Sequence, residues 1–363
     1  MKTIAFYIGS LEKGGAERVF VNLAEFFESI GYNVVMVTQY KKNNEYRISD
    51  NVVRILSDID ETEVTNSRIV NFSRRFFKLR NIWKKNNIDL VLTCTAKNNF
   101  MTIVSSWGLH TKPVVSVVGE ARLEYPGRLM RFLANFLFPF ASGIILQTEK
   151  SRKFFSKYVN KKAVVLPNSL NPLFMTDRYE GEKEKNVVAV GRMDDNKNHA
   201  MIISAFSKLV KKYPEYTLTI YGDGEKRKYL NDLVHQLNID GKVYMPGVIN
   251  NIQERIYKSR CFVIASDSEG VSNALIEALA LGIPSIATDV PSGGTRELIE
   301  NEINGIIIPV QDEEKLIESM DRIMGDDSLV EKLSVNAAKI QTKLAPERVN
   351  KMWKDYFEKI IGC

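Results

Sequence analysis

Short apolar runs alternate with amphipathic helical segments along nearly the whole chain. The first half contains seven runs typical of strands, at residues 3–8, 33–38, 52–56, 89–94, 113–118, 143–148 and 163–167. The second half contains six more, at residues 186–191, 216–222, 242–247, 261–266, 284–289 and 305–310. Such alternation predicts parallel sheets with crossover helices. We therefore expect an α/β protein with doubly wound domains.

The pattern restarts in the middle of the chain, after Pro167-Asn168 and a polar stretch at residues 177–186. We predict one domain over residues 1–168 and a second over residues 169–345, each of ordinary domain size. Residues 346–363 are predicted to form one more amphipathic helix. The pattern alone does not assign this helix to a domain, and we expect it to cross back to the first one.

One predicted helix, at about residues 272–281, is apolar on nearly every side and contains a single charged residue, Glu277. Such a helix is buried, and a buried carboxylate needs a hydrogen-bond partner. Glu269 and Gly270 lie just before this helix, and Asn273 lies one turn from Glu277. The arrangement suits a ligand with an anionic group at the helix N-terminus and a diol beside it. For Glu277 alone, a structural carboxylate with an Arg or backbone partner remains the alternative.

Glycine turns follow four consecutive predicted strands of the second half. They are Gly191-Arg192 through Lys197-Asn198, Gly222-Asp223-Gly224, Pro246-Gly247 and Glu269-Gly270. In doubly wound sheets, ligands bind outside the carboxyl ends of the strands. Arg192 and Lys197 could therefore neutralise a diphosphate. Unrelated surface charges are the alternative for this loop taken alone.

Composition and cysteine usage limit the class of protein. The chain is 44% hydrophobic and 26% charged, as ordinary globular proteins are. Cys94, Cys261 and Cys363 form no metal spacing and no disulfide framework, which fits a reducing compartment. The N-terminus lacks the apolar run of a signal peptide, and the longest apolar stretch, residues 132–146, is too interrupted to span a bilayer. We expect a cytoplasmic protein that is not integral to the membrane.

The net charge of +6 is unevenly distributed, because residues 68–85 contain many Lys and Arg residues and no acid. On a helix, an apolar stripe expected to dock on the sheet is formed by Ile69, Phe72, Phe76, Leu79 and Trp83. A separate basic face is formed by Arg74, Lys78 and Lys85. Exposed helices usually interleave charges of both signs, so this face indicates an anionic lipid surface or a phosphate-bearing substrate. A solvated surface helix is the alternative, and no nucleic-acid-binding motif is present.

Taken in order, these motifs resemble those of the family 4 glycosyltransferases of the GT-B fold, over essentially the whole chain. The motifs are Gly14-Gly15-Ala16-Glu17-Arg18, Pro167-Asn168, the loop Gly191 to Asn198, Gly222-Asp223-Gly224, Glu269 to Glu277 (EGVSNALIE) and Asn304-Gly305. The resemblance implies two Rossmann-like domains whose parallel sheets face a central cleft. The first domain would bind the acceptor and the second the nucleotide sugar. Within the family, the chain resembles bacterial enzymes that elongate sugars on polyprenyl-diphosphate carriers.

The resemblance also implies a role for individual residues. Glu269, Arg192 and Lys197 are the implied catalytic residues. The implied donor-binding residues are Gly191, Asn198, Gly222, Gly224, Pro246, Gly270, Val271, Ser272, Asn273 and Glu277. The implied acceptor-binding residues are Gly14, Gly15, Glu17, Glu120, Arg122, Arg74, Lys78 and Lys85. Relatives often carry His where this chain has Ala121, so we expect Glu120 or Arg122 to make that acceptor contact instead.

The predicted function is the retaining transfer of a hexose or N-acetylhexosamine from a UDP-sugar to a sugar on a polyprenyl-diphosphate carrier. This reaction would serve bacterial surface polysaccharide or glycan assembly, at an anionic membrane surface on the inner face of the cell membrane. We expect no cofactor and no metal, because two cations and a helix terminus stabilise the leaving group. The literal DxD sequence Asp58-Ile59-Asp60 lies in a connector away from these elements. The alternatives are a UDP-sugar 2-epimerase of the same fold and a non-catalytic nucleotide-sugar-binding module.

Overall fold

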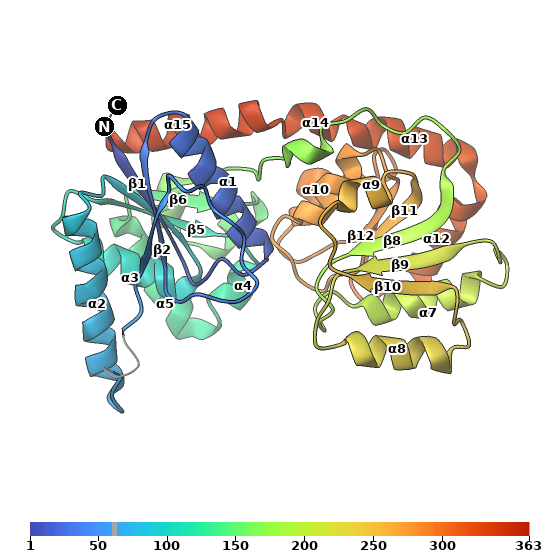
Figure 1. Cartoon of the computed structure of the whole chain (residues 1–363), viewed down its shortest axis with the longest axis horizontal. Helices are drawn as coiled ribbons and strands as arrows, with labels where there is room; N and C mark the ends of the chain where they lie inside the picture. The colour runs from blue at the N-terminus through green and yellow to red at the C-terminus, as the bar shows by residue number, and fades with distance from the viewer. Residues whose placement is uncertain (60–63, 363) are drawn as a thin grey trace. The chain divides into compact units, whose positions relative to one another are not determined.

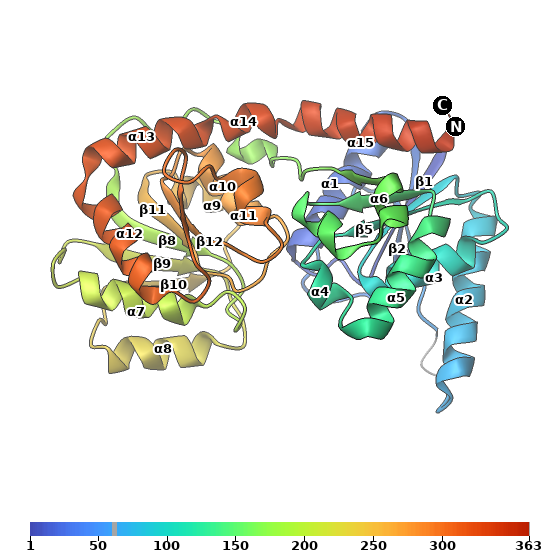
Figure 2. The ribbon, with the colours of Figure 1, turned by 180° about the vertical axis from the view of Figure 1, so that it is seen from behind.

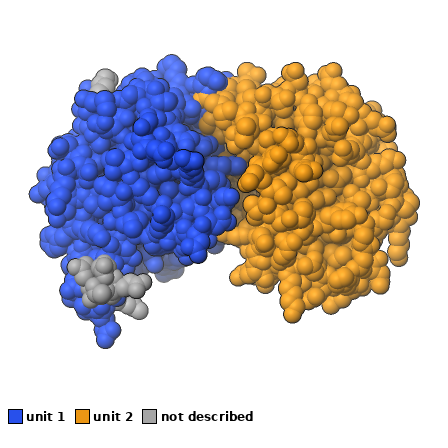
Figure 3. All heavy atoms as spheres, in the orientation of Figure 1, with its two compact units in different colours: residues 1–168, 347–363 blue, residues 169–346 orange. Residues whose placement is uncertain are grey.

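The computed structural model describes residues 1–59 and 64–362. The chain forms two compact units (Figure 3), Met1–Asn168 with Glu347–Cys363 as unit 1, and Ser169–Pro346 as unit 2. Each unit contains one parallel sheet covered by helices, as Figure 1 shows. The predicted α/β class with two doubly wound domains is therefore confirmed.

The sheet of unit 1 has seven strands in the order β3-β2-β1-β4-β5-β6-β7, and every neighbouring pair is parallel. The strands are β1 (Thr3–Ile8), β2 (Asn33–Thr38), β3 (Val53–Leu56), β4 (Leu90–Cys94), β5 (Lys112–Val117), β6 (Gly143–Leu146) and β7 (Ala163–Val165). All seven predicted runs form strands. The strand order reverses between β1 and β4, so the carboxyl ends of these two strands flank a crevice.

Helices cover both faces of this sheet because successive side chains of a strand point to opposite faces. The helices are α1 (Gly15–Ser29), α2 (Arg68–Lys85), α3 (Ala96–Ser106), α4 (Ala121–Glu124), α5 (Gly127–Leu137), α6 (Lys157–Lys162) and α15 (Pro346–Ile361). On one face, Phe6 of β1 contacts Phe27 of α1, and Phe27 stacks on Phe357 of α15 with ring centroids 5.0 Å apart. On the other, Tyr7 contacts Trp83 of α2. The last helix of the chain thus belongs to the core of unit 1.

The apolar stripe of α2 is buried only in its second half, which corrects the expectation that the whole stripe docks on the sheet. Leu79 and Trp83 are buried, whereas Ile69 and Phe72 are exposed. The reason is length: an 18-residue helix measures about 27 Å, whereas strands of four to six residues reach roughly 20 Å or less. The first turns of α2 therefore extend past the strands, as Figures 1 and 2 show.

The sheet of unit 2 has six parallel strands in the order β10-β9-β8-β11-β12-β13. The strands are β8 (Glu184–Val190), β9 (Thr217–Tyr221), β10 (Val243–Gly247), β11 (Ser259–Ile264), β12 (Ser285–Thr288) and β13 (Ile306–Ile308). The helices are α7 (His199–Leu209), α8 (Arg227–Gln236), α9 (Ile252–Ile256), α10 (Asn273–Ala280), α11 (Gly294–Leu298), α12 (Glu313–Gly325), α13 (Asp327–Ala338) and α14 (Ile340–Lys343). The switch point here lies between β8 and β11. Over the described residues, no helix combines the length and apolarity needed to cross a membrane.

Candidate active site

The most elaborate site lies at the switch point of unit 2, where the loops after β8 and β11 meet. Asn196 joins the two loops through three hydrogen bonds. Its Nδ2 donates to the carbonyl oxygen of Ser268 (2.8 Å), its Oδ1 accepts from the Ser268 amide (3.0 Å), and its own carbonyl oxygen accepts from the Asp267 amide (2.9 Å). This side chain fixes the position of Glu269, which follows directly. The sequence prediction missed Asn196, although it lies inside the basic loop.

The same pair of loops brings together two of the three predicted catalytic side chains. The Lys197 ammonium forms an ion pair with the Glu269 carboxylate, and both side chains are about one-fifth exposed. Ser266 Oγ donates to the same Glu269 oxygen at 3.0 Å. A partly exposed cation and carboxylate held at a strand end can bind a ligand that carries both negative charge and hydroxyl groups.

Arg192, the third predicted catalytic residue, lies at the mouth of the same loop. Its side chain is exposed, and its Nε donates to Asp194 Oδ2 at 2.5 Å. Burial would raise the pKa of Asp194, but the bonds from Arg192 and from the Lys197 amide outweigh it and hold that pKa below its ordinary value. Asp194 is therefore ionised at neutral pH and orients both ends of the basic loop.

Two glycines allow the loops of the site to approach each other closely. A Cβ on Gly222, whose φ is +136°, would lie 1.9 Å from the carbonyl oxygen of Gly191. A Cβ on Gly294 would lie 1.6 Å from the carbonyl oxygen of Gly270. No side chain fits at either distance, so these positions require glycine. Gly224 is a further predicted donor-site glycine. A Cβ added to it would likewise lie too close to the backbone, 2.4 Å from the carbonyl oxygen of Met193.

Helix α10 begins beside Glu269 and carries the predicted diol-binding residue. Ser272 is the N-cap residue, and its Oγ accepts from the Leu275 amide at 3.4 Å. Val271 and Ser272 are both buried, and Asn273 opens the helix. Glu277 lies one turn further, buried at 6% exposure. The positive end of the helix therefore points toward the loop that contains Glu269 and Gly270.

Other predicted donor-site residues have a structural role or lie further along the sheet edge. Asn198, in a left-handed conformation, caps α7 through its Oδ1, which accepts from the Met201 amide at 3.4 Å. Pro246 is exposed in β10, which is separated from β8 by β9. His199 begins α7, and burial lowers its pKa to about 4. That side chain is neutral at physiological pH, as suits a helix-start residue.

Five of the eight predicted acceptor residues follow β1 or β5, and the other three, Arg74, Lys78 and Lys85, lie on α2. Gly14 and Gly15 lead into α1, and an added Cβ on Gly14 would lie 2.3 Å from Glu17 Oε2. Glu120 and Arg122 flank the start of the short helix α4, and Arg122 is exposed. Ala121, at the position where relatives often carry His, is buried and has no polar group to offer.

A buried carboxylate that sequence reasoning missed lies in this same segment. Glu124 Oε1 accepts hydrogen bonds from the amides of Val118 (3.0 Å) and Gly119 (2.5 Å), directly after β5. Its Oε2 is buried and, among the described residues, has no hydrogen-bond partner. Burial raises the pKa of Glu124 to about 7. A second missed feature is Thr95 at the end of β4, whose φ of +71° is rare for a β-branched residue. The sequence offered one signal that could have identified both residues: each of them follows the end of a predicted strand.

The basic face of α2 is partly tied to a neighbouring loop. Lys78 donates to the carbonyl oxygen of Asp58, and Arg75 Nε donates to the Asp58 carboxylate at 2.8 Å. Helix α2 has no acidic residue of its own, so Asp58 compensates part of its positive charge from outside the helix. Asp58 thus contacts the basic helix, whereas Asp60, the other acid of the DxD sequence, lies outside the described residues.

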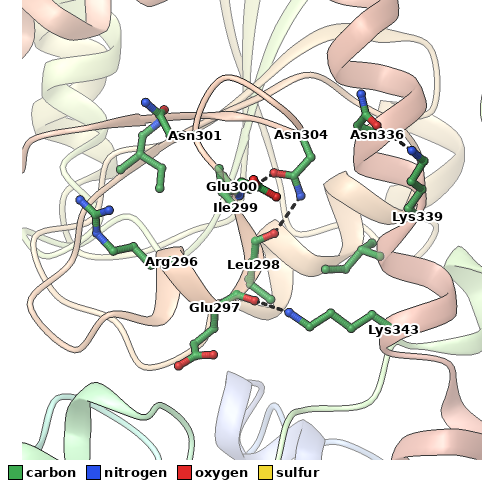
Figure 4. A pocket seen from close by; sticks show the side chains of 12 residues that line it. Arg296, Glu297, Leu298, Ile299, Glu300, Asn301, Asn304, Asn336, Lys339 and Lys343 are labelled. Carbon is green, nitrogen blue, oxygen red and sulfur yellow. Dashed lines mark hydrogen bonds between the residues drawn. The ribbon is translucent and has the colours of Figure 1, made fainter.

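A separate cavity lies elsewhere in unit 2. It has a volume of about 560 Å³ and is lined by residues of α11, of the segment that leads into β13 and of the region from α13 to α14 (Figure 4). Lys343 Nζ donates there to the carbonyl oxygen of Glu297 at 2.7 Å. None of the predicted site residues lines this cavity. Within residues 1–59 and 64–362, no group of three or more His, Cys, Asp or Glu side chains is placed to hold a metal ion.

Comparisons with known proteins match both halves of the chain. The family model "Glycosyltransferase Family 4" matches residues 13–172, and "Glycosyl transferases group 1" matches residues 175–340. One relative from Campylobacter jejuni is an α-1,4-N-acetyl-D-galactosaminyltransferase named for the acceptor GalNAc-alpha-(1->4)-GalNAc-alpha-(1->3)-diNAcBac-PP-undecaprenol. It is 27% identical over 349 residues, or 94% of each chain.

Solved structures share the fold over the whole chain. Sucrose-phosphate synthase of Thermosynechococcus elongatus superposes with a TM-score of 0.83 at 18% identity, covering 100% of both chains. HepE of Anabaena, solved in complex with UDP, gives a TM-score of 0.81 at 17% identity, covering 99% of this chain and 100% of its own. The chain is thus a glycosyltransferase of the GT-B fold. It belongs to the family 4 glycosyltransferases.

Proposed function

We propose that this glycosyltransferase moves a hexose or N-acetylhexosamine from a UDP-sugar to a sugar carried on a polyprenyl diphosphate, with retention of configuration. The reaction serves bacterial surface polysaccharide or glycan assembly. The single observation that carries the donor half is the meeting of Lys197, Glu269 and the N-terminus of α10 at the switch point of unit 2. One relative is named for an undecaprenyl-diphosphate-linked acceptor, and one structural neighbour was solved with UDP.

In the proposed mechanism, negative charge develops on the diphosphate as the bond to the sugar breaks. Arg192, Lys197 and the amides at the start of α10 stabilise that charge, so their contacts strengthen in the transition state. Glu269 holds the hydroxyl groups of the donor sugar, and Lys197 contacts both Glu269 and the diphosphate. Glu277 accepts hydrogen bonds from the ribose diol.

We assign no covalent nucleophile, because the sequence motifs supply no dedicated nucleophile and the two carboxylates Glu269 and Glu277 are assigned to hydroxyl groups of the donor. The acceptor hydroxyl attacks from the face that the diphosphate leaves. A phosphate oxygen of the leaving group takes the hydroxyl proton, so the products are the glycoside and the protonated nucleoside diphosphate. Because cations of the protein neutralise the leaving group, this mechanism needs no metal ion.

On the acceptor side, the basic face of α2 formed by Arg74, Lys78 and Lys85 contacts the carrier diphosphate. These three residues span about 16 Å along the helix. Residues Gly14, Gly15, Glu17, Glu120 and Arg122 contact the acceptor sugar. An acceptor with a polyprenyl chain lies in a bilayer, so the enzyme works at the membrane surface.

The test is a panel of UDP-sugars assayed with a polyprenyl-diphosphate-linked sugar, with and without excess chelator. We expect one donor to be consumed, an acceptor product whose anomeric configuration by NMR equals that of the donor, and equal rates with chelator. Formation of an epimerised UDP-sugar without acceptor would establish the epimerase instead. UDP binding without turnover of any donor would indicate the non-catalytic module. Loss of activity in chelator, restored by Mg²⁺ or Mn²⁺, would contradict the metal-free mechanism.

A further inference from the structure

Four exposed aromatic rings form a continuous ladder on unit 1. Trp107, just after α3, stacks on Phe140 with ring centroids 5.3 Å apart, Phe140 contacts Phe136 at 5.8 Å, and Phe136 stacks on Phe132 at 6.2 Å. Their exposures are 62%, 50%, 57% and 64%. Monomeric proteins rarely expose contiguous apolar patches of large area without an interaction partner. We call these four residues the aromatic ladder.

The helix that carries half of this ladder departs from the usual pattern of a surface helix. Ala134 of α5 is buried in the core of unit 1, and Met130 and Leu137 pack against the same core. The outward side should then be polar. Instead it carries Leu129 together with two residues of the ladder, at spacings of three and four, and Leu129 is also exposed. Helix α5 therefore has a second apolar face that the chain itself does not cover.

Basic side chains border the ladder. Residues 126–162 contain eight Lys or Arg residues and a single acid, Glu149, which is already paired with Arg152 at 2.7 Å. Lys162 Nζ donates to the carbonyl oxygens of Pro139 (2.5 Å) and Ala141 (3.1 Å), on either side of Phe140. Arg128 is exposed next to Leu129. We call Arg128 and Lys162 the basic border of the ladder. An aromatic surface with a basic border matches the interface of an anionic bilayer, where rings enter the headgroup boundary and cations contact phosphates.

One end of the ladder is held by α2. Arg80 Nη1 donates to the carbonyl oxygens of Ser105 (3.1 Å) and Trp107 (2.6 Å), so the basic helix holds the backbone from which Trp107 projects. Figure 2 shows α2, α3 and α5 on the same side of the sheet of unit 1. The helix proposed to contact the carrier diphosphate and the ladder are thus parts of one continuous structure.

We infer that the aromatic ladder, with Leu129 and its basic border, docks this protein on an anionic lipid bilayer. The inference deepens the proposed function, since it assigns the surface that brings the enzyme to a membrane-borne acceptor. A second copy of the chain is the competing occupant. In a symmetric dimer the same face meets itself, which would set two basic borders against each other, and like charges across an interface disfavour association.

Trp107 provides a direct readout. Of the three tryptophans in the chain, all within the described residues, Trp83 and Trp353 are buried. Addition of vesicles of phosphatidylcholine and phosphatidylglycerol should therefore shift the emission of Trp107 to shorter wavelength, and brominated lipids should quench it. Trp107→Phe should abolish both signals. Vesicles of phosphatidylcholine alone, or added salt, should weaken binding because they remove or screen the anionic charge.

The decisive variant is Phe132→Ser/Phe136→Ser, compared with Tyr229→Ser/Tyr244→Ser, which alters two exposed tyrosines of unit 2. In vesicle sedimentation we expect the ladder variant to lose roughly tenfold or more in partitioning, and the control variant to partition like the wild type. Equal partitioning of the ladder variant and the wild type would overturn the inference. So would a wild-type dimer, seen in sedimentation velocity, that the ladder variant dissociates without any change in vesicle binding.

Failure of the transferase proposal would look different. The vesicle assay contains neither donor nor acceptor, so it reports docking whether or not the chain transfers a sugar. Conversely, the ladder variant should keep wild-type turnover of a water-soluble sugar acceptor, since no ladder residue belongs to the proposed site.

Discussion

Both units place functional groups after the ends of their strands, but the two sites are constructed differently. In unit 2, the loops after β8 and β11 are joined by Asn196 and by the Lys197–Glu269 ion pair. Close backbone contacts at Gly222 and Gly294 join each of these loops to the loop after the neighbouring strand. In unit 1, the residues after β4 and β5 include a strained Thr95 and the buried Glu124. The first site is a set of polar groups that hold each other in place. The second combines a buried carboxylate with exposed basic and aromatic surfaces.

This difference suggests a division of tasks. A nucleoside diphosphate is small and has the same charged groups whichever sugar it carries, so it is bound best by a preorganised set of charges. A long, membrane-borne acceptor favours an extended surface that contacts phosphate, lipid and sugar at separate places. The following predictions test whether the two units differ in this way.

The largest expected effect lies in the ion pair of unit 2. Lys197→Ala should lower turnover about 10²–10³-fold, because its contact strengthens as charge develops on the diphosphate. The apparent affinity for the donor should fall much less. Lys226→Ala serves as the matched control. It also removes a lysine from an ion pair, in this case the pair with Asp195, and leaves the Lys197–Glu269 pair in place. A loss confined to donor KM with unchanged kcat would show that Lys197 only binds the ground state.

A smaller effect is expected one turn inside α10. Glu277→Ala should weaken UDP binding by about 1.5–3 kcal/mol, the usual range for hydrogen bonds to a charged group. Calorimetry with UDP measures this directly, and circular dichroism checks that the buried substitution leaves the fold intact. Glu277→Gln, which keeps the size of the side chain, separates loss of charge from loss of packing. Unchanged UDP affinity in both variants would remove Glu277 from the donor site.

The sequence predicts unit 2 better than unit 1 for a physical reason. Glycine turns, the basic loop and the nearly uncharged helix α10 are local patterns, and each forces one local conformation at a known strand end. All thirteen predicted strands form, because runs rich in β-branched residues are local signals as well.

Unit 1 shows where local patterns fail. The stripe of α2 has perfect helical spacing, yet Ile69 and Phe72 are exposed because the lengths of helix and strands differ. Glu124 lies in a segment with no motif, and only the folded chain shows that its carboxylate is enclosed. The aromatic ladder joins a residue just after α3, two residues of α5 and one in the turn after α5, so no linear pattern displays it. Such features depend on tertiary neighbours, which spacing along one helix does not define.

Glu124 offers a test of unit 1 through pH. Its pKa is raised by burial to about 7, against 4.5 in an unfolded chain. Between these values the folded protein binds more protons than the unfolded one, so the free energy of unfolding falls as pH rises from about 4.5 to about 7 and stays low above it. Glu124→Gln cannot ionise and should exceed the wild type in stability by on the order of 3 kcal/mol at pH 8.

The same difference should shrink toward zero below about pH 4, where wild-type Glu124 is largely protonated in both states. Denaturant unfolding at several pH values, with the exposed Glu149→Gln as control, measures both limits. A stability difference that does not change with pH would mean that the Glu124 carboxyl is not desolvated as the structure indicates.

The smallest expected effect concerns the basic face of α2. Arg74→Gln/Lys78→Gln/Lys85→Gln should raise KM for the lipid-linked acceptor roughly three- to tenfold, since exposed charges contribute only modestly each. A soluble acceptor without the diphosphate should be used equally well by both proteins, and donor KM should not change, because the proposed donor residues belong to unit 2. Lys211→Gln/Lys228→Gln/Lys332→Gln removes the same charge from unit 2 and should leave all three values unaltered. If KM in detergent stays at the wild-type value while vesicle binding falls and salt erases the difference, α2 attracts the membrane in general and does not hold the carrier diphosphate.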